Sequence, residues 1–94
     1  MDVRALFGLR PTPTGRVIVM AEHRGWGNTI DWLDYPTREL YGCLPLKPVV
    51  GDVVECQMRS GRTARFLILK TRYPGDPHDM FFATTDAGTA VVTP

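Results

Sequence analysis

Cysteine and histidine are scarce in this 94-residue chain, which has two of each and no CxxC spacing. Cys43 and Cys56 are too few for a disulfide framework or a zinc site, so we expect reduced thiols and no metal or other cofactor. Long hydrophobic runs are also missing. The longest, "VIVMA", has five residues, which is too short for a bilayer span or a secretory signal. These absences predict a cytoplasmic protein.

Charge of one sign is not in excess. Eleven basic residues against ten acidic ones give a net charge of +1. This argues against a non-specific nucleic-acid binder, although it is compatible with a local basic patch. Nine of the basic residues are arginine and two are lysine. Arginine is favoured at interfaces, and a GC-rich genome would raise its use in the same way.

A catalytic signature is lacking as well. Asp76, His78 and Asp79 in "GDPHDM" do not have the spacing of a recognised metal site, and a turn rich in Gly and Pro explains the segment without metal. Cys56 is expected on an apolar strand face, where a thiol is normally inert. The sequence therefore predicts a protein that is not an enzyme.

The chain does contain short β-branched or alternating segments separated by turn residues, enough for one small domain. Pro11 and Pro13 indicate that residues 1–15 form an N-terminal arm or edge strand ahead of a single domain over residues 16–94. Pro36 and Gly42 predict a short helical turn within residues 34–43. Strands are predicted at residues 16–23, 29–34, 52–58, 62–70, 80–85 and 89–92, the first two as a hairpin. The fold class is mainly β: a small five- to six-stranded antiparallel barrel with one short helical turn.

The stretch "MRSGRTARFLILKTR" carries five basic residues and no acidic one, and strand register decides how they are arranged. A three-residue loop over residues 59–61, with Gly61 in the left-handed conformation, pairs Cys56 with Ala64 on an apolar face. The same register places Glu55 opposite Arg65, which is a favourable cross-strand pair. A two-residue loop would instead place Arg59 against Arg62. The sequence therefore predicts a hairpin with the three-residue loop.

This register also places apolar side chains on the opposite face of the hairpin, namely those of Val53, Leu67 and Leu69. We expect the N-terminal arm, a neighbouring strand or a partner to cover them. Trp32 alternates with polar neighbours in "TIDWLD" and is expected in the core.

"VVGDVVEC" entering a strand, "RSGR" at a tight hairpin and "RFLILK" leaving it resemble the small SH3-like barrels, including the Tudor and KOW kinds. The resemblance covers roughly residues 46–85. It implies an SH3-like barrel that binds peptides, modified tails, RNA or ribosomal surfaces, without selecting among them. The small size and missing catalytic motifs also resemble the accessory and inhibitor proteins that phages encode.

Two functional hypotheses follow. The leading one is a non-catalytic protein-interaction or inhibitor module, with Arg24 and Trp26 in the loop "HRGWGN" and Arg59 and Arg62 at the hairpin tip as partner contacts. The alternative is an RNA- or DNA-binding barrel. In that case the phosphate contacts come from Arg59, Arg62, Lys70 and Arg72, and Trp26 stacks on a base. Trp26 could also fold back over the barrel end. The sequence leaves the oligomeric state open.

Overall fold

The computed structural model describes residues 11–23, 28–75 and 80–91 as a mainly β domain. Along the chain its elements are β1 (Val17–Val19), a 3-10 turn η1 (Met20–His23), β2 (Thr29–Asp34), β3 (Glu39–Cys43), β4 (Val53–Gln57), β5 (Thr63–Arg72), β6 (Met80–Thr85) and β7 (Thr89–Ala90). No helix in this part of the chain is long and apolar enough to cross a bilayer.

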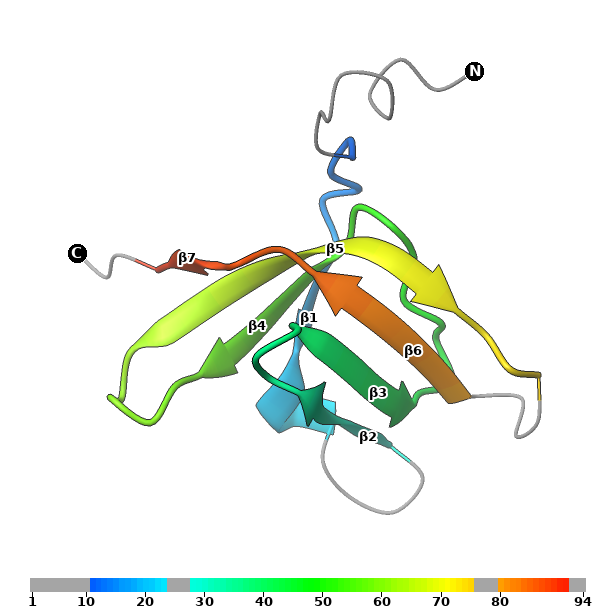
Figure 1. The fold of residues 1–94 in the computed structure, drawn as a ribbon, viewed down its shortest axis with the longest axis horizontal. Helices are drawn as coiled ribbons and strands as arrows, with labels where there is room; N and C mark the ends of the chain where they lie inside the picture. The colour runs from blue at the N-terminus through cyan, green and yellow to red at the C-terminus, as the bar shows by residue number, and fades with distance from the viewer. Residues whose placement is uncertain (1–10, 24–27, 76–79, 92–94) are drawn as a thin grey trace.

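The strands form one curled sheet in the order β1-β4-β5-β6-β3-β2, and β7 pairs with β5 (Figure 1). The ten-residue β5 is shared between the two halves of the sheet: its first half pairs with β4 and β7, and its second half pairs with β6. The register shifts between Ile68 and Lys70, where these two halves meet. Irregularities of this kind bend a strand, so the sheet curls into a half-barrel around its core.

The predicted hairpin register is confirmed. Cys56 pairs with Ala64 and Glu55 with Arg65. The Arg65 Nε lies 2.9 Å from a Glu55 carboxylate oxygen. Gly61 has φ +86°, as the three-residue loop requires. Strands β2 and β6 also lie at the positions in the chain where the sequence predicts them.

The predicted strand over residues 16–23 is mostly wrong. Only Val17–Val19 is extended, and it pairs in parallel with β4 rather than in a hairpin with β2. The chain then turns through η1, which brings Met20 into the core with 4% of its surface exposed. An unbroken apolar run does not distinguish a longer strand from a strand that turns inward.

The predicted helical turn within residues 34–43 is also wrong, since Glu39–Cys43 is strand β3, paired with β2 and β6. Pro36 lies in the β2–β3 turn, which ends at Arg38 with φ +60°. The residues that follow alternate as strand residues do: Leu40 and Gly42 are buried, whereas Tyr41 is exposed. The 3-10 turn of this fold is η1.

The core lies inside the curl of the sheet and draws on every strand from β1 to β6. Its buried hydrophobic residues are Ile18, Met20, Ile30, Leu40, Leu44, Val54, Cys56, Phe66, Ile68, Phe81 and Ala83. Of the three residues predicted to need cover, Leu67 is buried, Val53 is half-buried and Leu69 is exposed. Pro11 and Pro13 line a groove of about 330 Å³ with Val53 and Leu67.

A buried carboxylate attaches the N-terminal segment to the sheet. Asp52, fully buried, accepts hydrogen bonds from Arg16 Nε at 2.9 Å, the Val49 backbone N–H at 2.9 Å and the Thr14 hydroxyl. Arg16 also forms an ion pair with it and donates to the Lys47 carbonyl at 3.0 Å. One side chain thereby fixes residues 14–16 against the loop that precedes β4.

The lowered pKa of Asp52 determines how its contribution to the stability of the fold changes with pH. Burial, the largest single effect, raises the pKa, but hydrogen bonds from Arg16, Thr14 and Val49 and the Arg16 charge together lower it below its ordinary 3.8. A carboxylate with a lowered folded-state pKa contributes stability above the unfolded-state pKa, and this is lost as pH falls through the folded value.

We expect the stability difference between the parent and Asp52→Asn to be constant from about pH 7 to about pH 5 and to shrink below about pH 4. Urea titrations across this range test it, and a constant difference down to about pH 2 would contradict it.

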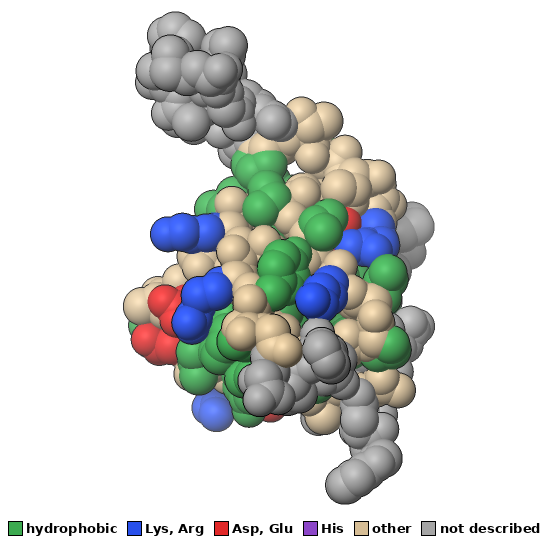
Figure 2. All heavy atoms as spheres, turned by 90° about the vertical axis from the view of Figure 1, so that its right-hand side faces the viewer, with side chains coloured by type: hydrophobic (Ala, Val, Ile, Leu, Met, Phe, Trp, Pro, Cys, Tyr) green, Lys and Arg blue, Asp and Glu red, His purple; other side chains and the backbone are tan. Residues whose placement is uncertain are grey.

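Hydrophobic and basic side chains share the side of the molecule where β5 ends and β6 begins (Figure 2). The exposed aliphatic residues of the β3–β4 connection are Leu46, Val49 and Val50. On β5, Lys70 and Arg72 are exposed, and they belong to the sheet rather than to a loop. The positions of these two basic residues are therefore set by the strand pairing of β5.

Candidate binding groove

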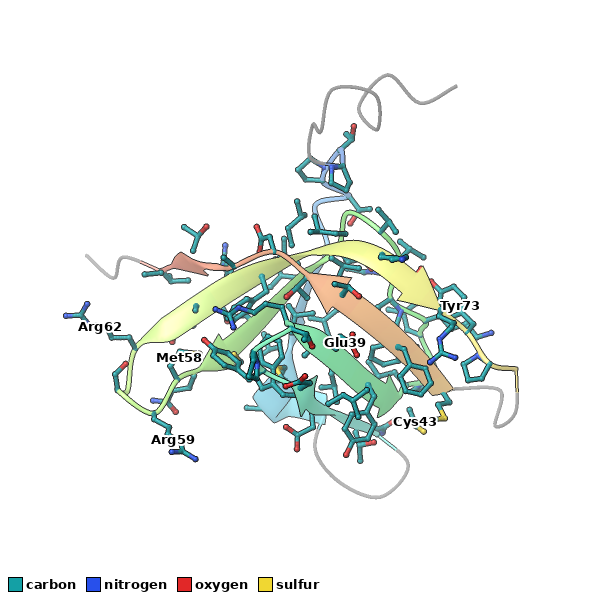
Figure 3. All side chains as sticks on the ribbon, viewed as in Figure 1. Glu39, Cys43, Met58, Arg59, Arg62 and Tyr73 are labelled. Atoms are coloured by element: carbon teal, nitrogen blue, oxygen red, sulfur yellow. The ribbon has the colours of Figure 1, made fainter. Side chains whose placement is uncertain are left out.

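A groove of about 620 Å³ lies between the β2–β3 turn and the tip of the β4–β5 hairpin. It is lined by Trp32, Tyr35, Gln57, Met58, Arg59 and Ser60. Three other hollows on the described surface are smaller, at about 320, 220 and 330 Å³. Met58 and Arg59 lie at the hairpin turn (Figure 3), so this groove is at one end of the half-barrel.

Two aromatic rings form a corner in this groove. The Trp32 and Tyr35 rings are 5.0 Å apart and nearly perpendicular, with an interplanar angle of 87°. Trp32 also packs edge-on against the buried Phe66, with 4.9 Å between ring centroids. The prediction that Trp32 belongs to the core is therefore half right, because the ring contacts the core and also lines the groove. This contact holds the aromatic corner in place.

The β2–β3 turn positions Tyr35 by local hydrogen bonds. The Arg38 backbone N–H donates to the Tyr35 carbonyl at 3.0 Å, and the Arg38 guanidinium donates to the same oxygen at 2.6 Å. The Arg38 guanidinium carbon lies 4.2 Å from the centroid of the Tyr35 ring, in a cation–π contact. One face of the Tyr35 ring is thus covered by Arg38, although the residue is still 38% exposed.

The structure separates the basic residues of the stretch from residue 58 to residue 72 into two groups. Arg59 and Arg62 are exposed at the hairpin tip, at the opposite end of β5 from Tyr73 (Figure 3), whereas Lys70 and Arg72 lie next to Tyr73 in the chain. Arg65, between them, is paired with Glu55. Of the four predicted phosphate contacts, two therefore lie at each end of the strand.

Several predicted site residues lie outside the described part of the chain. Arg24 and Trp26 do, as does the loop with Asp76, His78 and Asp79, for which the sequence predicts a turn without metal. Their roles stay predictions. Within the described residues, no group of three His, Cys, Asp or Glu side chains lies close enough to hold a metal ion.

The two thiols differ in environment. Cys56 is buried, and its pKa is raised by burial and, to a smaller extent, by the Glu55 charge, against an opposing hydrogen bond with Trp32. A raised pKa keeps the thiol protonated and poorly nucleophilic at neutral pH. Cys43 is half-buried and also free.

No family model matches the chain, and comparisons with the curated proteins and with the solved structures give no match.

Proposed function

We propose that this protein is a non-catalytic protein-interaction module that binds a partner through the groove between Trp32, Tyr35 and Arg59. The observation that carries the proposal is the aromatic corner open to solvent, with Trp32 fixed on the core by Phe66. Trp, Tyr, Met and Arg are the residues enriched at the centres of protein interfaces.

The chemistry of the groove supports binding rather than catalysis. Its lining combines two aromatic rings, a methionine, an arginine and two neutral polar side chains. The hydroxyl groups in this lining are those of Ser60 and Tyr35, and the lining holds no histidine or carboxylate to act as a base for either. Among the described residues Arg59 has no ion pair, so its charge is available to a carboxylate on a partner.

An SH3-like architecture, a cytoplasmic location and an inhibitory role belong to the same proposal. The curled sheet and the tight β4–β5 hairpin support the first. Free cysteines, as found in reducing compartments, support the second. An inhibitor needs a preorganised surface more than a reactive one, and the packing of Trp32 against Phe66 supports this role. Arg24, Trp26 and Arg62 are proposed as additional partner contacts.

A random peptide library selected on the full chain tests the proposal. A selected peptide is expected to bind Tyr35→Ala about 30-fold more weakly than the parent protein, as for an aromatic interface hot spot. Tyr41→Ala is a matched control, because Tyr41 has the same 38% exposure but lies outside the groove. Fluorescence anisotropy of the labelled peptide measures both. Equal affinities for the two variants would reject the groove as the binding site.

A further inference from the structure

Beyond this groove, the outer face of β3, β6 and β5 carries a second arrangement that points to a ligand. Tyr41 of β3 pairs with Phe82 of β6, and Phe82 pairs with Arg72 of β5. The three residues therefore form one row across three adjacent strands. Their strand neighbours Leu40, Phe81 and Ala83 are among the buried core residues, so the row points away from the core.

The row presents flat groups to solvent. Tyr41 is 38% exposed, Phe82 is half-buried and Arg72 is exposed. The Arg72 guanidinium carbon lies 4.3 Å from the centroid of the Phe82 ring. Stacking on the ring orients the guanidinium, and Arg72 as a whole remains exposed. Aromatic rings and guanidinium planes are the groups on which proteins stack unpaired bases.

The positive charges on this face lie along β5, at Lys70 and Arg72. Lys70 pairs with Thr84 next to the row, and a hollow of about 320 Å³ lies between Lys70, Arg72, Phe82 and Glu39. Within the described residues neither Lys70 nor Arg72 has a carboxylate partner. They are about 7 Å apart by strand geometry, comparable with the separation of successive phosphates in an extended single strand.

The opposite margin of the same face is acidic. Asp31 pairs with Tyr41 across β2 and β3, and Glu39 pairs with Thr84. Carboxylates accept hydrogen bonds from the exocyclic amino groups of bases. A single strand could therefore lie with its phosphates along β5, near Lys70 and Arg72, and with its bases directed toward the carboxylates on β2 and β3.

We infer that the row Tyr41–Phe82–Arg72, with Lys70 beside it, is a stacking platform for single-stranded nucleic acid. It is distinct from the peptide groove, and it uses two of the four predicted phosphate contacts, Lys70 and Arg72. The hairpin-tip arginines Arg59 and Arg62 are not part of it.

The test is fluorescence anisotropy of a labelled single-stranded oligonucleotide titrated with the full chain. With two phosphate contacts, affinity is expected to fall about sevenfold as salt rises from about 50 to about 200 mM. The double variant Lys70→Ala/Arg72→Ala should lose most of this salt dependence. Arg59→Ala/Arg62→Ala removes the same charge from the hairpin tip and should keep it.

Base stacking is tested separately from the phosphate contacts, by removing an aromatic ring and measuring the affinity for the oligonucleotide. Tyr41→Ala is expected to weaken binding about tenfold with an unchanged salt dependence, whereas Tyr35→Ala should bind like the parent. Circular dichroism of each variant confirms that the fold is retained. No binding at low salt, equal affinity for the matching duplex, or equal losses in the two double variants would overturn the platform.

Discussion

Asp52→Ala is expected to lower the free energy of unfolding by about 3 kcal/mol. The substitution removes a fully buried carboxylate that accepts from Arg16, Thr14 and Val49. It leaves the Arg16 charge without its partner and the Val49 N–H without its acceptor. Since these donors lie in two separate segments, the substitution removes the side-chain contacts that join the N-terminal segment to the β3–β4 connection. Urea denaturation of the variant and the parent measures the loss.

Glu55→Ala is the matched control for this prediction. It breaks the other ion pair among the described residues, but there the Arg65 side chain is 50% exposed. A pair so open to water contributes less than about 1 kcal/mol. If both variants lost the same stability, the Asp52 contacts would count for no more than a surface pair. Asp52→Asn, which keeps the shape without the charge, should fall between them.

Parts of the fold governed by local rules could be predicted from the sequence. The β4–β5 register followed from strand alternation and the position of Gly61, since a shift by one residue would bring Arg59 against Arg62. Two predictions failed where contacts distant in sequence decide the structure. The parallel pairing of β1 with β4 joins residues about 36 positions apart, Val17 with Val53. The strand β3 depends on pairing with both β2 and β6.

The candidate sites were less predictable than the fold. The groove joins Trp32 and Tyr35 to Met58, and no sequence motif links these two segments. The residue types in "DWLDYP" were its one local signal. Asp52 was also missed as a structural residue, although a Gly-Asp pair directly before a strand is a signal for a turn in which a side chain accepts backbone hydrogen bonds.

Gly42→Ala is expected to cost about 3 kcal/mol or more, because β2 approaches β3 too closely for a side chain there. An added Cβ would overlap the Thr29 carbonyl oxygen and lie 2.9 Å from Ile30 Cα and 3.0 Å from a Phe81 ring carbon. Two of these neighbours belong to backbone, so β2 itself must shift, and β2 carries Trp32. Thermal unfolding of Gly42→Ala and Gly61→Ala separates this packing effect from backbone strain. Gly61 has φ +86° and open space around it, so alanine there should cost about 1 kcal/mol. Equal losses at both positions would show that β2 can move away freely.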